Sequence, residues 1–268
     1  MITLYDNPFS PFARKVRMVL DFKALSYRSV DALALDQLED LERVNARAEV
    51  PVLVDGGVTV VESADIVAYL EDRHPTPALF PGSPELRAKA RHWQRIADRV
   101  LDAVVHDVSL WAWPTHSRQD QPPPGLVEAA RRDLSAVLAQ LEQALGDGSY
   151  ICGELSVADL AVFPHTSSLK PLGIVLGEGS LPRVYAWFLR MREQPVVRED
   201  LAYVKRAAKE KFVENPSPYE GEKVIWRGDR IEWLLSKGFD AWWAAERASG
   251  RAVVPSSLEK VLGSPVPH

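Results

Sequence analysis

The stretch that decides the fold is YDNPFSPFARKVRMVL, residues 5–20. An apolar run, residues 2–5, leads into it and predicts a short buried strand. The Asn7-Pro8 pair then predicts a turn. Ser10 followed by Pro11 is typical of a helix start, with serine as the N-cap and proline at the first helical position. The stretch therefore predicts a strand, a short loop and a helix.

The helix after Ser10 is predicted to have two faces. Its apolar side chains recur at helical spacing, and the other face carries Arg14, Lys15, Arg17 and Asp21. The first N–H groups of a helix have no intrahelical partner, and the helix dipole adds partial positive charge, so a negative group is stabilised there. Ser10 lies at this start with a hydroxyl that can donate a hydrogen bond. A plain N-cap is the commoner role of such a serine.

Composition places the chain among globular proteins and excludes several functional classes. Its 268 residues suffice for one large or two ordinary domains, and 46% of them are hydrophobic and 26% charged, which argues against general disorder. A net charge of -5 without a dominant basic cluster disfavours nucleic-acid binding. No apolar run has the length of a membrane span, and no secretory signal is visible. Cys152 is the single cysteine, which excludes an intramolecular disulfide, so we expect a cytoplasmic protein.

Residues 1–76 predict a small mixed sheet with helices. Strands are predicted at residues 2–5, 27–30, 50–54 and 58–61. Helices are predicted after Ser10, within residues 33–44, and from Glu62-Ser63 to just before Pro75. The first two strands and the helix between them form a parallel crossover unit, and Asp55-Gly56-Gly57 predicts a hairpin. This order is that of a thioredoxin-like α/β domain.

Residues 77–84 form a proline-rich linker, and the chain beyond it predicts helices without a convincing strand. Helices are predicted from Ser83 to Trp113, over residues 126–145, from Ser156, and at residues 182–191 and 197–212. Ser156 and Asp159 have the spacing of a capping arrangement, an acid three residues after a serine. The helix that they start is the most apolar of the chain, so we expect it at the centre of an all-α helical bundle over residues 85–214.

Residues 215–268 form a C-terminal extension that is rich in tryptophan. Four of the eight tryptophans lie in it: Trp226, Trp233, Trp242 and Trp243. That content argues against a disordered tail. Residues 229–247 predict one amphipathic helix. We expect it to pack on the helical domain or over the cleft between the domains, and favour packing on the helical domain.

Three features of the first domain carry candidate chemistry. The first is Ser10 at a helix start. The second is Val50-Pro51, which in the cis form would turn the backbone groups of Val50 outward to pair with a peptide. The third is Glu62-Ser63 at another helix start, where N–H groups and a hydroxyl can hold a carboxylate and Glu62 an ammonium. Taken singly, each has a structural explanation: a cap, an ordinary trans proline and a capping pair.

Together the three features resemble the N-terminal domain of the serine-type glutathione S-transferases. The resemblance covers about residues 1–205, and GELSVAD at residues 153–159 is similar to the capping motif of that family's central helix. It implies that Ser10 addresses the glutathione sulfur. The residues that it implies for glutathione binding are Phe12, Val50, Pro51, Glu62 and Ser63. It also implies a homodimer, glutathione as co-substrate and no metal.

The loop before Val50 departs from the family's pattern. The family usually has Asn-Pro-x-Gly-Lys/Gln-Val-Pro, whereas this chain has NARAEVP at residues 45–51. Loss of the proline and glycine changes the loop, and Glu49 replaces a residue that is often basic or an amide. The contacts to the glycine end of glutathione are therefore in question, and Arg47 is a candidate for a compensating charge. This departure favours the alternative of a binding protein that keeps the fold without catalysis.

The expected chemistry is stabilisation of a thiolate. A thiol with a pKa of about 8.5 is mostly protonated at neutral pH, and lowering that pKa by about two units requires about 2.7 kcal/mol. A hydrogen bond to a charged acceptor contributes about 1.5–3 kcal/mol, and a helix terminus about 0.3–1 kcal/mol. A hydrogen bond from Ser10 together with the helix terminus therefore contributes enough free energy to stabilise the thiolate. Tyr5 and Asn7 are the alternative donors.

The electrophile is expected to be small and hydrophobic and to bind between the domains. The wall is predicted at residues 104–113, with His106 and Trp113 as candidate contacts. A structural histidine, and core packing for Trp111 and Trp113, are the alternatives. The sequence thus predicts a glutathione transferase without a nucleic-acid or membrane partner. A glutathione-dependent isomerase, lyase or peroxidase is the other enzymatic alternative.

Overall fold

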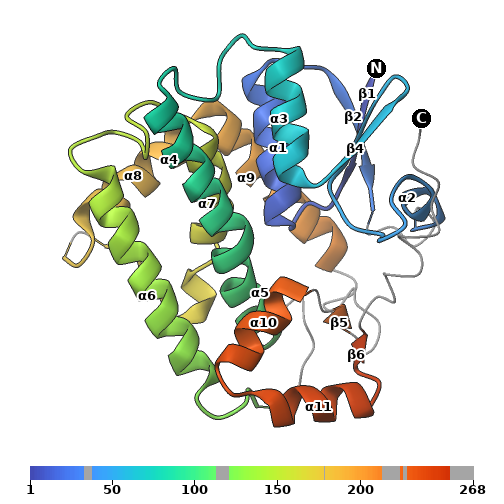
Figure 1. Ribbon diagram of the computed structural model, residues 1–268, viewed down its shortest axis with the longest axis vertical. Coiled ribbons are helices and arrows are strands. Elements are labelled where there is room, and N and C mark those ends of the chain that lie inside the picture. Colours follow the sequence, from blue (N-terminus) through green and yellow to red (C-terminus); the bar gives the residue numbers. More distant parts are fainter. Residues whose placement is uncertain (33–37, 113–120, 178, 213–223, 226–227, 254–268) are drawn as a thin grey trace. The chain divides into compact units, whose positions relative to one another are not determined.

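The structure is a computed structural model, and it describes residues 1–32, 38–112, 121–177, 179–212, 224–225 and 228–253 (Figure 1). The chain divides into two compact units, one formed by Met1–Ala78 and one by Leu79–Val253. Among the described residues, no helix is long and apolar enough to cross a membrane. Within that same part of the chain, no cluster of three or more His, Cys, Asp or Glu side chains is arranged to hold a metal ion.

The first unit is a four-stranded mixed sheet with helices, as predicted. Its elements are β1 (Ile2–Asp6), α1 (Pro11–Phe22), β2 (Tyr27–Asp31), α2 (Leu38–Val44), β3 (Val52–Asp55), β4 (Val58–Val61) and α3 (Ser63–Arg73). The strand order is β2-β1-β3-β4; β2 is parallel to β1, whereas β3 and β4 are each antiparallel to the strand before them in this order. Helices α1 and α3 pack side by side on one face of the sheet (Figure 1). Leu4, Val16, Leu53 and Ile66 are completely buried and represent the core.

Helix α1 is buried on both of its predicted faces. Arg14, Lys15 and Arg17 are only 4%, 1% and 4% exposed. Lys15 places its ammonium 5.8 Å from the centroid of the Phe12 ring, and Arg17 forms an ion pair with Asp6. The periodicity separated an apolar face from a charged one, but it could not show that the charged side chains have partners inside the protein.

A buried lysine joins the ends of helices α1 and α3. Lys23, just beyond α1, donates from Nζ to Glu71 Oε2 at 2.7 Å, to the carbonyl of His74 at 2.6 Å and to the carbonyl of Pro77 at 3.0 Å. An ammonium has three donors, and all three are used here. Lys23 therefore fixes the chain after α3 to the end of α1.

The second unit is helical, with two very short strands. Its elements are α4 (Pro84–Arg95), the π-helical segment η2 (Ile96–Leu101), α5 (Asp102–Ala112), α6 (Leu126–Leu145), α7 (Val157–Thr166), the 3₁₀ turn η3 (Lys170–Leu172), α8 (Pro182–Glu193), α9 (Pro195–Phe212), β5 (Val224–Ile225), α10 (Gly228–Ser236), α11 (Asp240–Ala248) and β6 (Ala252–Val253). The expectation of a helical chain without strands is wrong, because β5 and β6 pair in parallel. The long helix predicted from Ser83 is present as α4, η2 and α5 in succession.

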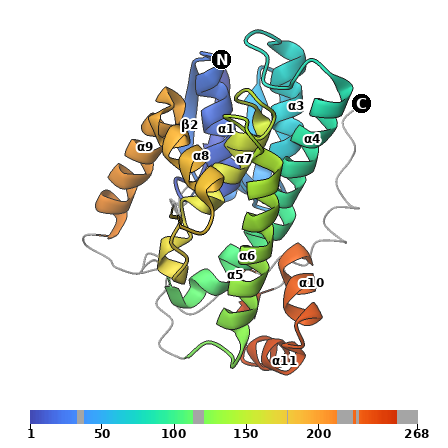
Figure 2. The same ribbon diagram turned by 90° about the vertical axis from the view of Figure 1, so that its left-hand side faces the viewer.

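Helix α7 is the buried centre of this unit, as predicted, and lies between α4 and α8 (Figure 2). Its capping box is formed by Ser156 and Asp159. Asp159 Oδ2 accepts from the backbone N–H and the hydroxyl of Ser156, both at 3.0 Å. Asp159 Oδ1 accepts from the Ile151 N–H at 3.0 Å and from Trp187 Nε1 at 2.9 Å. One buried carboxylate therefore starts the central helix and fixes two neighbouring segments.

The C-terminal extension packs on the helical unit, as favoured from the sequence. Helix α10 contacts α5, and Trp233 Nε1 donates to Asp133 Oδ2 on α6 at 2.9 Å. The single predicted helix over residues 229–247 is wrong, because the chain breaks at Gly238, whose φ of +78° lies in the left-handed region. Trp226, Trp113 and residues 254–268 lie outside the described residues.

Candidate active site

The strand register brings the three candidate features to one edge of the sheet. Tyr5 in β1 pairs with Val52 in β3, and Val52 pairs in turn with Val61 in β4. The loop to Ser10 leaves β1 after Asp6, Val50-Pro51 immediately precedes β3, and Glu62, followed by the first residue of α3, immediately follows β4. Because β3 is antiparallel to both of its neighbours, the end of β1, the start of β3 and the end of β4 coincide at this edge.

Ser10 is the N-cap of α1, as predicted. Its Oγ accepts a hydrogen bond from the Ala13 N–H at 3.3 Å, and Pro11 occupies the first helical turn. The side chain is partly exposed. Because a hydroxyl both accepts and donates, capping leaves the O–H of Ser10 able to donate to an anion at the helix start.

The Val50-Pro51 peptide bond is cis, the form that would turn the backbone groups of Val50 outward, and not the ordinary trans form. The loop before it is held by its own contacts. Asn45 Nδ2 donates to the Glu49 carbonyl at 3.0 Å, and Arg47 Nη2 lies 2.8 Å from Glu49 Oε1. The carboxylate of Glu49 is therefore paired with a guanidinium from its own loop.

The Glu62-Ser63 pair combines an unusual backbone with a buried hydroxyl. Glu62 is the N-cap of α3 with a φ of +65°, a region that costs a non-glycine residue energy and that is enriched at functional sites. Its exposed side chain makes no capping hydrogen bond. Ser63, the first residue of α3, is only 6% exposed. The pair thus presents a carboxylate, a hydroxyl and helix N–H groups together.

Two helix starts therefore meet this edge, one beyond β1 and one beyond β4. Neighbouring strands lie about 4.8 Å apart, so β1 and β4, two steps apart, are separated by about 10 Å. An extended tripeptide spans at most about 10 Å. The edge therefore has the length of a short peptide and a positive helix end at each limit, which suits a ligand with two separated negative groups.

Asp6 and Arg17 belong to the same edge, although no role was predicted for them. Arg17 pairs with Asp6 at the end of β1 and reaches the carbonyls of the loop that leads to Ser10. The sequence feature that could have indicated this ion pair is an acid at the end of the first strand followed by a base two turns into the next helix. Charge alone, however, does not identify which of three basic residues is the partner.

The candidate contacts to a second substrate lie in the helical unit. His106 is half-buried on α5, and its carbonyl accepts from the Ser109 hydroxyl at 2.6 Å. Trp111 at the end of α5 lies 5.8 Å from Trp242 of α11, measured between ring centroids. Trp111 is half-buried and packs against the extension, while Trp113 is outside the described residues.

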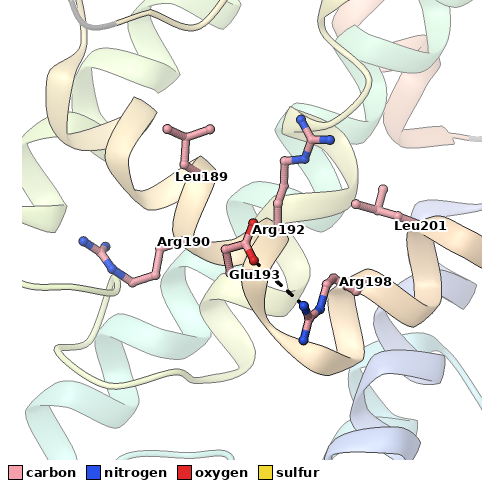
Figure 3. A pocket seen from close by; sticks show the side chains of 6 residues that line it. All are labelled: Leu189, Arg190, Arg192, Glu193, Arg198 and Leu201. Carbon is pink, nitrogen blue, oxygen red and sulfur yellow. Dashed lines mark ion pairs between the residues drawn. The ribbon is translucent and has the colours of Figure 1, made fainter.

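A cavity of about 560 Å³ lies elsewhere, between α8 and α9. It is lined by Leu189, Arg190, Arg192, Glu193, Arg198 and Leu201 (Figure 3). None of these is a predicted site residue. Arg190 turns away to donate to the Ser149 carbonyl, and Arg198 lies 4.0 Å from Glu193. The cavity therefore does not change the assignment of the candidate site to the sheet edge.

Comparison with known proteins agrees with this geometry. Residues 4–78 match the family model of the glutathione S-transferase N-terminal domain, and residues 107–195 match the model of the C-terminal domain. A probable glutathione S-transferase GSTU1 of Oryza sativa subsp. japonica is 30% identical over 205 residues, which cover 70% of this chain and 84% of that protein. The chain belongs to the glutathione S-transferase family. As a member of that family it is an enzyme of the glutathione transferase class.

Solved glutathione S-transferase structures have the same fold. The glutathione S-transferase from Rhodospirillum rubrum F11 superposes with a TM-score of 0.66 at 28% identity, covering 75% of this chain and 92% of that one. The β-etherase LigF from Sphingobium sp. strain SYK-6 gives the same TM-score of 0.66 at 24% identity, with coverage of 75% and 98%. At that identity the likeness concerns the fold alone.

Proposed function

We propose that the protein uses Ser10 to stabilise the thiolate of bound glutathione for attack on a small hydrophobic electrophile. The observation that carries the proposal is the position of Ser10, a partly exposed hydroxyl at the α1 start on the edge shared with Val50-Pro51 and Ser63. Glutathione has a thiol at its centre and a carboxylate at each end. The edge offers one helix start to the sulfur and the other to the γ-glutamyl carboxylate.

The roles of the remaining residues follow from what each presents. Val50 pairs with the tripeptide backbone, and Pro51 and Phe12 flank it. Ser63 holds the γ-glutamyl carboxylate, and Glu62 holds the ammonium at the same end. No protein thiol takes part, because Ser10 donates a hydrogen bond and the glutathione sulfur is the nucleophile.

The energy required is available at this position. A donor to the thiolate contributes about 1.5–3 kcal/mol, and each pKa unit corresponds to about 1.4 kcal/mol. Ser10 therefore accounts for a depression of the thiol pKa of about one to two units, and the α1 dipole adds about half a unit.

His106 on α5 remains the proposed polar contact of the electrophile. We also propose, from the family resemblance, a cytoplasmic homodimer.

The test compares Ser10→Ala with Ser83→Ala. Ser83 is a second serine N-cap followed by proline, and its Oγ accepts from the Leu86 N–H at 3.2 Å, so it matches Ser10 in every capping respect. Each variant is expected to lose about 1 kcal/mol of stability. Only Ser10→Ala is expected to raise the pKa of bound glutathione, measured by thiolate absorbance, by about one to two units.

Two results would contradict the proposal. A wild-type protein that does not bind glutathione refutes the enzymatic reading and leaves the binding-protein alternative. A Ser10→Ala variant that binds glutathione with an unchanged thiol pKa removes Ser10 from the mechanism, and Tyr5 or Asn7 then becomes the donor to test.

A further inference from the structure

We propose that Asp6 and Arg17 are positioning residues for Ser10. Their buried ion pair fixes the loop between β1 and α1, and the loop sets the direction of the Ser10 hydroxyl. The inference rests on the proposed function of Ser10. It adds a constraint on the position of Ser10 beyond the cap hydrogen bond and the pairing of the strands.

The guanidinium of Arg17 contacts three oxygens at the end of β1. Its Nη1 lies 2.5 Å from Asp6 Oδ1 and donates to the Asn7 carbonyl at 3.4 Å, and its Nη2 donates to the Pro8 carbonyl at 3.2 Å. The side chains of Arg17 and Asp6 are 5% and 0% exposed. The donors of the planar guanidinium point in fixed directions, so its contacts fix how the acid and the two carbonyls lie relative to one another, whereas the donors of an ammonium rotate.

Asp6 is itself fixed by the sheet. Its second carboxylate oxygen accepts from the Ser29 hydroxyl on β2 at 3.2 Å, and its carbonyl accepts from the Ala32 N–H at 2.8 Å. The acid is therefore held by the neighbouring strand while it holds Arg17. The position of the guanidinium is set from the rigid part of the unit.

One atom links this pair directly to Ser10. The Asn7 carbonyl accepts from both Arg17 Nη1 and the Ser10 N–H, the latter at 3.1 Å. The Asn7 side chain accepts from the Phe9 N–H at 2.9 Å and closes the turn. The backbone of Ser10 thus receives its position from an oxygen that Arg17 orients.

A buried ion pair is not needed for stability, because apolar residues of similar size often serve equally well. The pair here instead fixes a loop whose one hydroxyl must point at a reacting atom. A misplacement of about 1 Å at such a group can reduce a rate by about a hundredfold. Positioning therefore explains why two charges are retained in this interior.

The decisive variant is Asp6→Leu/Arg17→Met, which removes both charges and leaves none buried alone. We expect the thiol pKa of bound glutathione to rise by about one unit and kcat to fall about tenfold, with the glutathione KM within about twofold of wild type. In a Ser10→Ala background the same double substitution is expected to add nothing to the thiol pKa. A merely structural role would raise the thiol pKa by the same amount in both backgrounds.

The control is Lys23→Met/Glu71→Leu, which removes another ion pair of the same unit, 2.7 Å apart, with a buried lysine and a partly buried glutamate, away from the loop. It is expected to leave the thiol pKa unchanged in the folded protein. Should the Asp6 and Arg17 double variant not fold, Arg17→Lys is used. This variant keeps a positive charge beside Asp6 but loses the planar guanidinium, and we expect it to raise the thiol pKa by less than the double variant would.

The outcomes separate the two proposals. If Ser10→Ala leaves the thiol pKa unchanged, the proposed function and this inference both fail. If Ser10→Ala raises it but neither the double variant nor Arg17→Lys does, the inference alone fails. An equal rise in the wild-type and Ser10→Ala backgrounds also overturns it.

Discussion

The two ends of the sheet edge should be separable by mutation, and Ser63 is the residue that tests this. Ser63 is the first residue of α3, it is 6% exposed, and it follows the end of β4, on the far side of β3 from β1. If it holds the γ-glutamyl carboxylate, Ser63→Ala removes one hydrogen bond to a charged group. The sulfur end, about 10 Å away across two strand spacings, is untouched.

The magnitude follows from that single bond. A hydrogen bond to a charged group is worth about 1.5–3 kcal/mol, and each 1.4 kcal/mol is a factor of ten, so glutathione should bind about 10–150-fold more weakly. The N–H groups and dipole of α3 remain and prevent a complete loss. Because the interaction is equal in the ground and transition states, KM should rise while kcat at saturating glutathione changes less than about twofold.

The assay is calorimetric titration with S-methylglutathione, in which the thiol is blocked and only the remaining contacts report. Cysteinylglycine, which lacks the γ-glutamyl group, should bind the wild type and Ser63→Ala equally. Thr59→Ala on the exposed part of β4 serves as the control and should have no effect. A raised thiol pKa in Ser63→Ala, or an equal loss of affinity for cysteinylglycine, would refute the assignment of the two ends.

Two further predictions concern other parts of the chain. Burial raises the pKa of Asp133, but hydrogen bonds from Lys237 and Trp233 outweigh burial and hold it below the ordinary value. This contribution is therefore present above the unfolded pKa and lost as pH falls through the folded one. The protection factors of the α10 amides against hydrogen exchange, which are corrected for the intrinsic rate at each pH, should fall below about pH 4. Asp133→Asn should abolish that dependence. Ala48 has a φ of +50°, so Ala48→Gly should raise the free energy of unfolding by about 0.5–1 kcal/mol in urea, whereas Ala46→Gly in the same loop should not.

Local signals were sufficient for most of the first unit. Strand β1, the cap at Ser10 and the start of α1 at Pro11 depend on neighbouring residues only, and all three are confirmed. The convergence of Ser10, Val50-Pro51 and Ser63 required only the strand order, which the thioredoxin-like pattern supplies. Whether these residues hold glutathione remains a prediction.

Features that depend on contacts between residues distant in the sequence were not predicted. Arg17 is buried because Asp6, eleven residues earlier, is beside it in space, and helical periodicity contains no such information. The sequence shows a glycine at position 238, but an isolated glycine is tolerated within a helix, so it did not predict that one helix ends there and another begins. The short strands β5 and β6 pair across the two helices that lie between them, and two-residue strands leave no readable alternation.

The loop before Val50 departs from the family's sequence and is held by contacts of its own. Ala48 stands where the family usually has glycine, and its backbone is in the left-handed region that glycine favours, at a cost of about 1–2 kcal/mol. Two hydrogen bonds hold the loop: the Ala48 N–H donates to the Asn45 carbonyl at 2.8 Å, and the Asn45 amide donates to the Glu49 carbonyl. Arg47 pairs with the carboxylate of Glu49, so that charge does not face the edge alone. The altered loop is therefore held by its own hydrogen bonds and ion pair, and the carboxylate of Glu49 is paired within it.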